Sequence, residues 1–228
     1  MQAEEVKPEY YYQAVRRDVL HLVDPAGKRI LDVGCGEGGT AATLKAGGAA
    51  YAAGIEYVES AASRASTILD KVIAGDVCAV DLDFPPASFD VILCLDVLEH
   101  LAYPDAALSR LVPLLAPGGE FVISLPNIRY FGTLKQLIVN GDWPEEASGV
   151  FDATHLRWFT PKSTRRMLAR NGLTITHTER HASRPFTGIV ERFPGLSRYL
   201  SDWFTCQFVY KARKAAAPQP QILGEPDC

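Results

Sequence analysis

The chain has 228 residues, of which 47% are hydrophobic and 22% are charged, a composition typical of a globular protein with a sizeable core. A formal net charge of −4 excludes bulk electrostatic attraction to nucleic acid or to an anionic membrane as the basis of its function. Because no apolar run is long enough to cross a bilayer and residues 1–5 are not a signal peptide, we expect a cytoplasmic protein without a membrane partner.

We expect no metal site. The five cysteines fit neither a disulfide framework nor zinc-ligand spacing, so reduced thiols are the simplest interpretation. Cys35 and Cys94 are expected to pack as small apolar side chains. His177 and His181 lie on or beside a predicted strand, where a spacing of four residues does not bring two side chains together as it would on a helix.

The first predicted element is a helix from Pro8 to about Val23, which carries an apolar stripe at helical spacing. The tyrosines at 10–12 crowd its start, and we interpret them as packing residues. Arg16 and Arg17 are expected on solvated helix faces rather than in a phosphate site.

A glycine-rich turn follows between a strand and a helix, in residues 29–40. Gly34, Gly36 and Gly39 have the G-x-G-x-x-G spacing of dinucleotide binders, so a nicotinamide-nucleotide site stays open at this point. A plain turn is the other interpretation. Ligand binding is favoured because so many glycines cost backbone entropy that a plain turn does not need.

Strands and helices then alternate, and acidic residues stand at several strand ends. Predicted strands at 50–55, 72–74, 89–95 and 120–125 follow the first, with helices at 58–69 and 104–115 between them. Glu56 can accept hydrogen bonds from two ribose hydroxyls, and Asp76 from an exocyclic amine such as that of adenine. Since ligands of such sheets bind outside the carboxyl ends of the strands, Gly34, Glu56, Asp76 and Asp96 predict one nucleoside-shaped site.

The rest of the chain adds a loop, a helix and two more strands. A helix starts at Thr160–Pro161 and ends near Asn171–Gly172, and strands are expected at 173–178 and 205–212. The predicted fold class is an α/β, doubly wound, mostly parallel, seven-stranded Rossmann-like sheet whose last strand is antiparallel. We expect a single domain over 1–213, with acceptor-side insertions at about 127–160 and 183–204, and a disordered tail over 214–228.

Five blocks in register resemble class I methyltransferases that use S-adenosylmethionine. They are I-L-D-V-G-C-G-E-G-G, G-I-E, G-D-V, F-D-V-I-L-C-L-D-V-L-E-H-L and L-A-P-G-G-E-F-V-I-S-L-P-N. A nicotinamide dehydrogenase is not expected to carry the fourth block. Residues 125–130, 141–143 and 149–160 resemble a bacterial subgroup that occurs with enzymes of glycan and natural-product assembly, although Pro144 replaces the usual tyrosine of that subgroup. Ubiquinone-pathway O-methyltransferases share the Val97–His100 block, but we do not find their later sequence.

The resemblance implies the cofactor S-adenosylmethionine, the product S-adenosylhomocysteine and a set of cofactor-binding residues. Asp32, Gly34, Cys35 and Gly36 are implied around the methionine part, and Glu56 is implied at the ribose. Tyr57, Asp76 and Val77 are implied at the adenine, and Leu95 and Asp96 near the sulfonium. We expect methyl transfer to a small-molecule acceptor, with oxygen favoured over nitrogen, and a non-catalytic cofactor-binding relative is the rival of another class.

Two histidines are candidates for the base that takes the acceptor's proton. His155 stands in a polar and aromatic loop, and the sequence leaves open whether it is a base or a structural brace. His100 is interpreted mainly as a brace of the helix after the fourth strand, with catalysis as the alternative. The aromatic segment 183–204 can cover the acceptor, form a homodimer contact or close the core, and the sequence does not choose.

Overall fold

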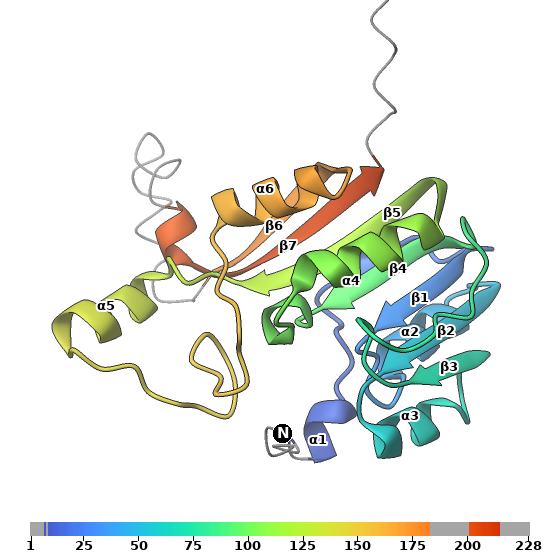
Figure 1. The fold of residues 1–228 in the computed structure, drawn as a ribbon, viewed down its shortest axis with the longest axis horizontal. Helices are drawn as coiled ribbons and strands as arrows, with labels where there is room; N and C mark the ends of the chain where they lie inside the picture. The colour runs from blue at the N-terminus through green and yellow to red at the C-terminus, as the bar shows by residue number, and fades with distance from the viewer. Residues whose placement is uncertain (1–6, 8, 183–200, 215–228) are drawn as a thin grey trace, which may run out of the picture.

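The computed structural model describes residues 7, 9–182 and 201–214, and its centre is one seven-stranded sheet (Figure 1). The strands are β1 (Arg29–Val33), β2 (Tyr51–Glu56), β3 (Lys71–Ala74), β4 (Phe89–Leu95), β5 (Leu115–Pro126), β6 (Leu173–Ala182) and β7 (Thr205–Lys214). They lie in the order β3-β2-β1-β4-β5-β7-β6, with β1 to β5 paired in parallel and β7 antiparallel to both neighbours. The predicted fold class is confirmed.

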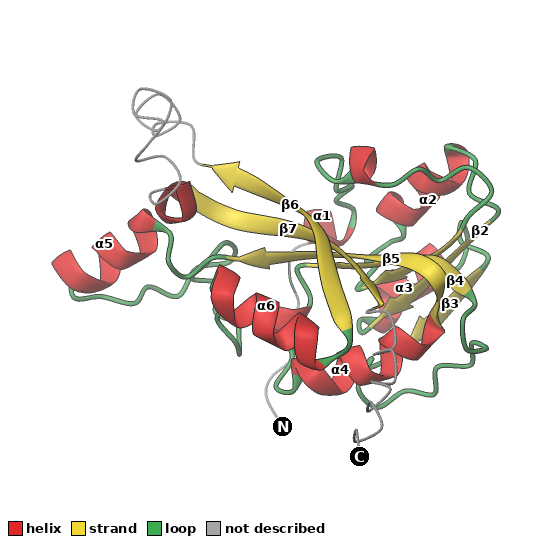
Figure 2. Ribbon diagram, turned by 90° about the horizontal axis from the view of Figure 1, so that it is seen from above, coloured by secondary structure: helices red, strands yellow, loops and turns green. Residues whose placement is uncertain are grey.

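Helices cover both faces of this sheet. They are α1 (Glu9–Tyr12), α2 (Gly39–Ala46), α3 (Glu59–Ala65), α4 (Pro104–Leu111), α5 (Phe131–Val139) and α6 (Pro161–Arg170), with 3-10 turns η1 (Leu20–Leu22), η2 (Leu98–His100) and η3 (Val112–Leu114). Figure 2 shows α4 and α6 on one side of the sheet and α2 on the other. None of the helices in the described part of the chain combines the length and apolar character needed to cross a bilayer.

The central strand β4 explains why helices cover both faces of the sheet, because its side chains are apolar on both faces. Val91 and Leu93 are buried in a cluster with Leu44 of α2, whereas Ile92 and Cys94 are buried in a larger cluster that includes residues of α4 and α6. Successive strand residues point to opposite faces, so a continuous apolar run buries both sides. This burial fixes the sheet that carries the glycine turn.

The predicted N-terminal helix over 8–23 is wrong. Only α1 and η1 are helical, and the chain between them is irregular. Its backbone binds the glycine turn instead: the carbonyl of Tyr12 accepts the N–H of Glu37 at 2.8 Å, and the N–H of Arg16 bonds the Thr40 hydroxyl at 3.1 Å. Val19, Leu22 and Val23 of the predicted apolar stripe are nevertheless buried and Val15 is only partly buried, while tertiary hydrogen bonds replace the helical ones.

The boundary between α4 and β5 also differs from the prediction. The helix ends at Leu111, followed by η3, and the strand begins at Leu115 rather than Glu120. Pro113 lacks the backbone N–H that a continuing helix would need. Leu115 instead pairs with Phe89 at the start of β4. The Pro-Gly-Gly turn consequently lies inside the stretch assigned to β5.

The segment 127–160, predicted as an insertion, leaves the sheet after β5 and carries α5 away from the body of the molecule (Figure 1). Its end is fixed by a capping box, in which Thr160 and Ser163 exchange hydrogen bonds at 2.8 and 3.1 Å. This cap confirms the predicted start of α6. The segment 183–200 and all of the predicted tail except Lys214 lie outside the described residues.

Candidate functional site

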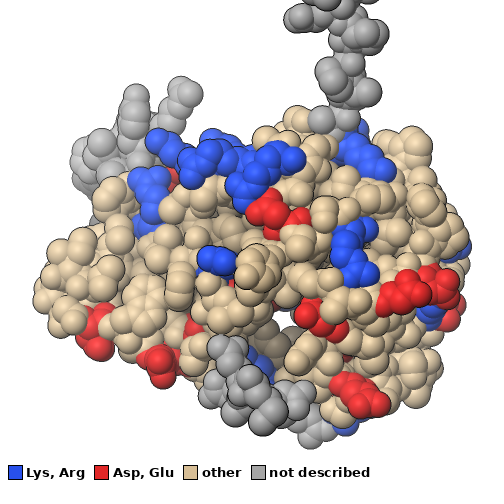
Figure 3. Space-filling model, in the orientation of Figure 1, with Lys and Arg blue, Asp and Glu red and all other residues tan. Residues whose placement is uncertain are grey.

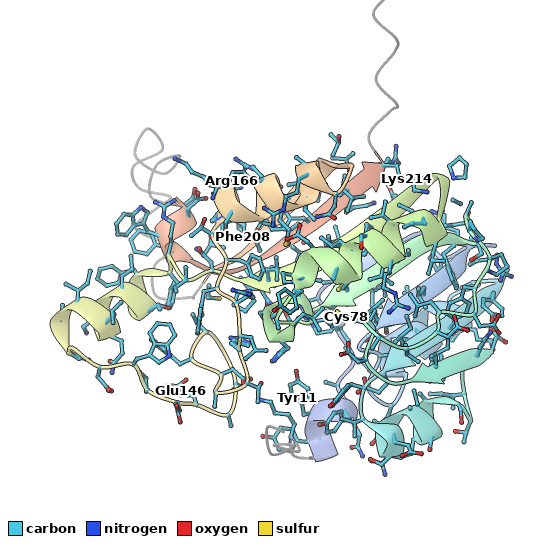
Figure 4. The ribbon with its side chains drawn as sticks, in the orientation of Figure 1. Tyr11, Cys78, Glu146, Arg166, Phe208 and Lys214 are labelled. Carbon is cyan, nitrogen blue, oxygen red and sulfur yellow. The ribbon has the colours of Figure 1, made fainter. Side chains whose placement is uncertain are left out.

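A cavity of about 1070 Å³ opens at the carboxyl ends of β1, β2 and β4 and beside the turn that follows β3. Figure 3 shows the surface hollowed near the position that α1 occupies in Figure 1. Figure 4 labels two lining residues, Tyr11 of α1 and Cys78 of the segment after β3. All ten residues that the sequence analysis assigned to a cofactor line this one cavity: Asp32, Gly34, Cys35, Gly36, Glu56, Tyr57, Asp76, Val77, Leu95 and Asp96.

The glycine turn forms one wall, and two of its glycines cannot be replaced without displacing neighbours. Gly34 and Gly36 have φ angles of +69° and +56°, in the left-handed region that glycine adopts at little cost. A Cβ on Gly34 would lie 2.5 Å from a methyl group of Val97, and a Cβ on Gly36 would lie 2.5 Å from the carbonyl oxygen of Tyr12. Close packing against Val97 and Tyr12 therefore requires glycine at both positions.

Glu56 joins the first two strand ends. Its carboxylate, in a residue only 5% exposed, accepts the N–H of Gly36 at 2.8 Å through one oxygen and the N–H of Val58 at 2.9 Å through the other. A carboxylate has about four lone-pair positions, so two backbone donors leave it able to accept further hydrogen bonds. This arrangement holds an acceptor-only group rigidly at the cavity wall.

Asp32 is buried under the glycine turn. Burial, followed by the negative charge of Glu56, raises the pKa of this carboxyl to about 7, although Arg16 and a hydrogen bond from the backbone of Ala41 oppose the shift. The cavity floor therefore holds an acid that changes charge near neutral pH.

This raised pKa predicts a pH-dependent stability. Between the ordinary value of 3.8 and about 7, the folded protein holds the Asp32 proton and the unfolded chain releases it, so the free energy of unfolding falls as pH rises. We expect this carboxyl to contribute a slope of up to about 1.4 kcal/mol per pH unit, and Asp32→Asn to remove it. Urea unfolding at pH 5, 6 and 7 checks this, with the exposed Asp81→Asn as control. An unchanged slope in Asp32→Asn would contradict the assignment.

Asp96 is held in an unusual backbone conformation at the end of β4. Its φ of +58° is left-handed, which is uncommon for a residue other than glycine. Its carboxylate forms an ion pair with Arg16 and accepts hydrogen bonds from the hydroxyl of Ser124, at 2.6 Å, and from the amide of Gln207. Arg16 also lines the cavity, so the expectation that it lies on a solvated helix face is wrong.

His100 is the histidine that lines the cavity, and its neighbours fix its tautomer. Its Nδ1 lies 3.0 Å from the hydroxyl and 3.3 Å from the carbonyl oxygen of Thr154. That hydroxyl is 2.6 Å from Asp152, to which it gives its only hydrogen, and the carbonyl can only accept. We therefore assign the proton of neutral His100 to Nδ1, which leaves Nε2 with a free lone pair.

His155 is not among the lining residues. It is only 8% exposed, and its ring meets that of His100 edge to face with 4.7 Å between centroids. Burial is the largest cause that lowers the pKa of both imidazoles, so both are neutral near pH 7. The structure brings the two predicted histidines together: His100 lines the cavity, and His155 packs against the ring of His100.

Glu99 was not predicted as a site residue. It is 1% exposed, and its backbone carbonyl accepts the N–H groups of Leu156 and Arg157 at 2.8 and 2.9 Å. Neither carboxylate oxygen has a hydrogen-bond partner among the described residues. Burial and the charge of Asp96 raise the pKa of this carboxyl well above its usual range.

The N-terminal segment supplies the other site residues that sequence reasoning missed. Lys7 forms an ion pair of 2.6 Å with Asp152, and Tyr11 lines the cavity together with Arg16. The triple tyrosine was the only available signal, because no motif marks these positions. The segment and the loop before α6 thus meet across one end of the cavity.

A family model described as a methyltransferase domain matches residues 8–178. The chain is 31% identical over 170 residues to a ubiquinone biosynthesis O-methyltransferase of Idiomarina loihiensis, covering 70% of this chain and 63% of that protein. A protein of the same description from Neisseria meningitidis is 31% identical over 164 residues, with 68% of each chain covered. The chain thus spans about two thirds of the length of these relatives.

Solved structures agree on the fold. An S-adenosylmethionine-dependent methyltransferase from Mesorhizobium loti has a TM-score of 0.61 at 21% identity, covering 84% of this chain and 93% of that one. Magnesium protoporphyrin IX methyltransferase from Synechocystis PCC 6803, solved with bound S-adenosylhomocysteine, has a TM-score of 0.61 at 17% identity, covering 91% and 83%. With the sheet order and the family match, these findings establish that the chain belongs to the class I S-adenosylmethionine-dependent methyltransferases.

Proposed function

We propose that this chain transfers a methyl group from S-adenosylmethionine to a hydroxyl oxygen of a small molecule. The observation that carries the proposal is the single cavity that joins the acidic strand ends at Glu56 and Asp76 to a polar end at His100. A nucleoside cofactor and a small acceptor both need room, and a volume of about 1070 Å³ accommodates the two together.

The residues present fit the cofactor. Glu56 has lone pairs left for ribose hydroxyls, and Val77 offers an apolar surface for the adenine ring next to the carboxylate of Asp76. The absence of a Cβ at Gly34 and Gly36 lets a ligand approach the turn closely. S-adenosylmethionine supplies a methyl group made electrophilic by a positively charged sulfur. Acidic residues outnumber basic ones in the cavity lining, which suits this positive charge.

The task of the protein is then to hold the acceptor oxygen in line with the methyl group. A hydroxyl acceptor must also lose its proton, and His100, which lines the cavity, has a free lone pair on Nε2 that can accept it. His155 stays the alternative, but it does not line the cavity and packs against the ring of His100. The relatives described as O-methyltransferases support oxygen over nitrogen. The resemblance of residues 149–160 to the bacterial subgroup supports an acceptor from glycan or natural-product biosynthesis.

Incubation of the chain with cofactor labelled in the methyl group and a panel of phenols, sugars and amines tests this proposal. Label recovered on a hydroxyl of a phenol or sugar supports it. Label recovered on an amine would favour the nitrogen alternative. Binding of S-adenosylhomocysteine without transfer to any acceptor of the panel would favour the non-catalytic relative, and protection against heat by NADH alone would contradict the family assignment.

The ribose contact can be tested separately. We expect Glu56→Ala to weaken S-adenosylhomocysteine binding by about 1–3 kcal/mol, the cost of losing a charged hydrogen-bond acceptor. Calorimetry measures the affinity, and Glu56→Gln is the matched variant, because it keeps one oxygen for the backbone N–H groups of the turn. An unchanged dissociation constant in both variants would mean that the ribose is held elsewhere.

A further inference from the structure

We propose that Glu99, His100 and His155 bind a divalent transition-metal ion at the polar end of the cavity. One potential ligand atom from each residue lies within 4.8 Å of the other two. The ion-binding claim stands on this geometry alone, whereas its role in catalysis rests on the proposed methyl transfer. The proposal departs from the expectation of no metal site, because the ligands come from two segments that only the fold brings together.

The carboxylate of Glu99 is the observation that points to a ligand. It is buried, and both of its oxygens lack a hydrogen-bond partner among the described residues. A buried carboxyl without hydrogen bonds is costly, and such a group stays protonated unless a cation or a metal ion pairs with it. Two basic side chains lie in this region, but Lys7 is paired with Asp152 and Arg16 with Asp96. Neither basic side chain pairs with Glu99, so a cation bound there would replace the proton of this carboxyl and give its oxygens a partner.

His100 is oriented as a metal-binding histidine usually is. Its Nδ1–H is donated to Thr154, whose hydroxyl is in turn bound by Asp152. Such hydrogen bonds around a metal site hold the ring in one tautomer and leave the other nitrogen free for the ion. His155 packs edge to face against the His100 ring, with 4.7 Å between the ring centroids. The loop that bears His155 is tied to Glu99 by the two N–H bonds from Leu156 and Arg157.

The donor set indicates the class of ion. Two imidazole nitrogens and one carboxylate oxygen suit Zn²⁺ or Fe²⁺, and the lack of a thiolate disfavours Cu⁺. Zn²⁺ bonds such ligands at about 2.0–2.2 Å, so binding would draw the three atoms to within about 3–3.5 Å of one another. Three protein ligands leave at least one coordination position open. Since His100 lines the cavity, that position can face an acceptor.

The ion would act as a Lewis acid, with no change of oxidation state. An acceptor hydroxyl bound to it ionises more easily and releases its proton to solvent. The oxygen then attacks the methyl carbon, an O–C bond forms, the C–S bond breaks and the electron pair of that bond stays on sulfur. Charge is balanced, because the sulfonium becomes a neutral thioether as the oxygen loses its negative charge.

Calorimetric titration of the full chain with ZnCl₂, after dialysis against a chelator, tests the site without requiring activity. We expect one tight site in the wild type. Its affinity should fall about 100-fold or more in Glu99→Gln and in His155→Gln, because losing only a hydrogen bond to a metal ligand already costs about 10–100-fold. Glu99→Gln preserves side-chain size and keeps the position uncharged, as the raised pKa of Glu99 does in the metal-free protein, so this variant is expected to fold. His177→Gln is the control, because it alters an exposed histidine that contacts Glu179.

Retention of the tight site in Glu99→Gln and His155→Gln, or its loss in His177→Gln, would overturn the proposal, as would the absence of any tight site in the wild type. Titration with S-adenosylhomocysteine separates this result from the proposed function. A chain that binds the cofactor product and methylates an acceptor after chelation, yet binds no Zn²⁺, would refute the metal site and leave the methyltransferase activity standing.

Discussion

Gly34→Val is expected to abolish cofactor binding. The substitution asks a β-branched residue to adopt a φ of +69°, and even its Cβ would lie 2.5 Å from a methyl group of Val97. Val97 itself lines the cavity, so relief of the clash must move either the glycine turn or Val97. Because Glu56 accepts the N–H of Gly36 in the same turn, a displaced turn also disturbs the carboxylate that we propose binds the ribose. Calorimetry with S-adenosylhomocysteine measures the loss.

Two control variants separate the causes of this effect. Gly118→Ala introduces a side chain at a comparable φ of +77° but into open space, so it reports the cost of backbone strain alone. We expect it to lower the melting temperature slightly and to leave the affinity intact. Gly34→Ala keeps the clash with Val97 but adds only one carbon. Near-normal affinity in a folded Gly34→Val protein would contradict the placement of the cofactor against this turn.

Much of the cavity could be predicted because its residues follow apolar strands. Glu56 and Asp96 stand where β2 and β4 end, and parallel strands bring such ends to one edge of a sheet. A local pattern was sufficient there, since the sheet supplies the long-range geometry. The same reasoning predicted the sheet itself, including the antiparallel strand β7.

The N-terminal part of the site could not be predicted in this way. Val19 and Leu22 have helical spacing and are buried, yet the segment is irregular because Tyr12 and Arg16 use their backbone groups to bind the glycine turn. Helical propensity is weak compared with such tertiary contacts. The position of Arg16 beside Asp96 follows from this path and from no motif.

The histidine cluster shows a second limit of sequence reasoning. His155 stands in the more conspicuous loop, but His100 is the residue that lines the cavity. The difference arises because the loop packs onto η2 through Glu99, a contact between residues far apart in the sequence. No periodicity reports how a long loop folds back on the sheet.

The role of His100 provides the sharpest functional test. We expect His100→Gln to leave S-adenosylhomocysteine affinity nearly intact, because His100 is not among the residues assigned to the cofactor, and to cut the rate of methyl transfer by about 10²–10⁴-fold. The loss has this size whether Nε2 accepts the proton directly or holds the proposed ion, since either role promotes ionisation of the acceptor. Single-turnover rates at saturating acceptor measure it, with His177→Gln as control.

Repeating these rate measurements across a pH series distinguishes a chemical role of His100 from a structural one. If His100 promotes loss of the acceptor's proton, part of the lost rate should return at high pH, where more of a hydroxyl acceptor is already ionised. If the ring only braces the loop through Thr154, His100→Gln should instead lower the melting temperature and weaken acceptor binding, with no rescue by pH.

His155→Gln, measured alongside with and without added Zn²⁺, adds a second comparison. If the rate falls in both variants and responds to Zn²⁺ only in the wild type, the two rings bind one ion. If the rate falls only in His100→Gln and is independent of Zn²⁺, His100 is the base. A stable His100→Gln protein with a normal rate at every pH would remove His100 from the mechanism.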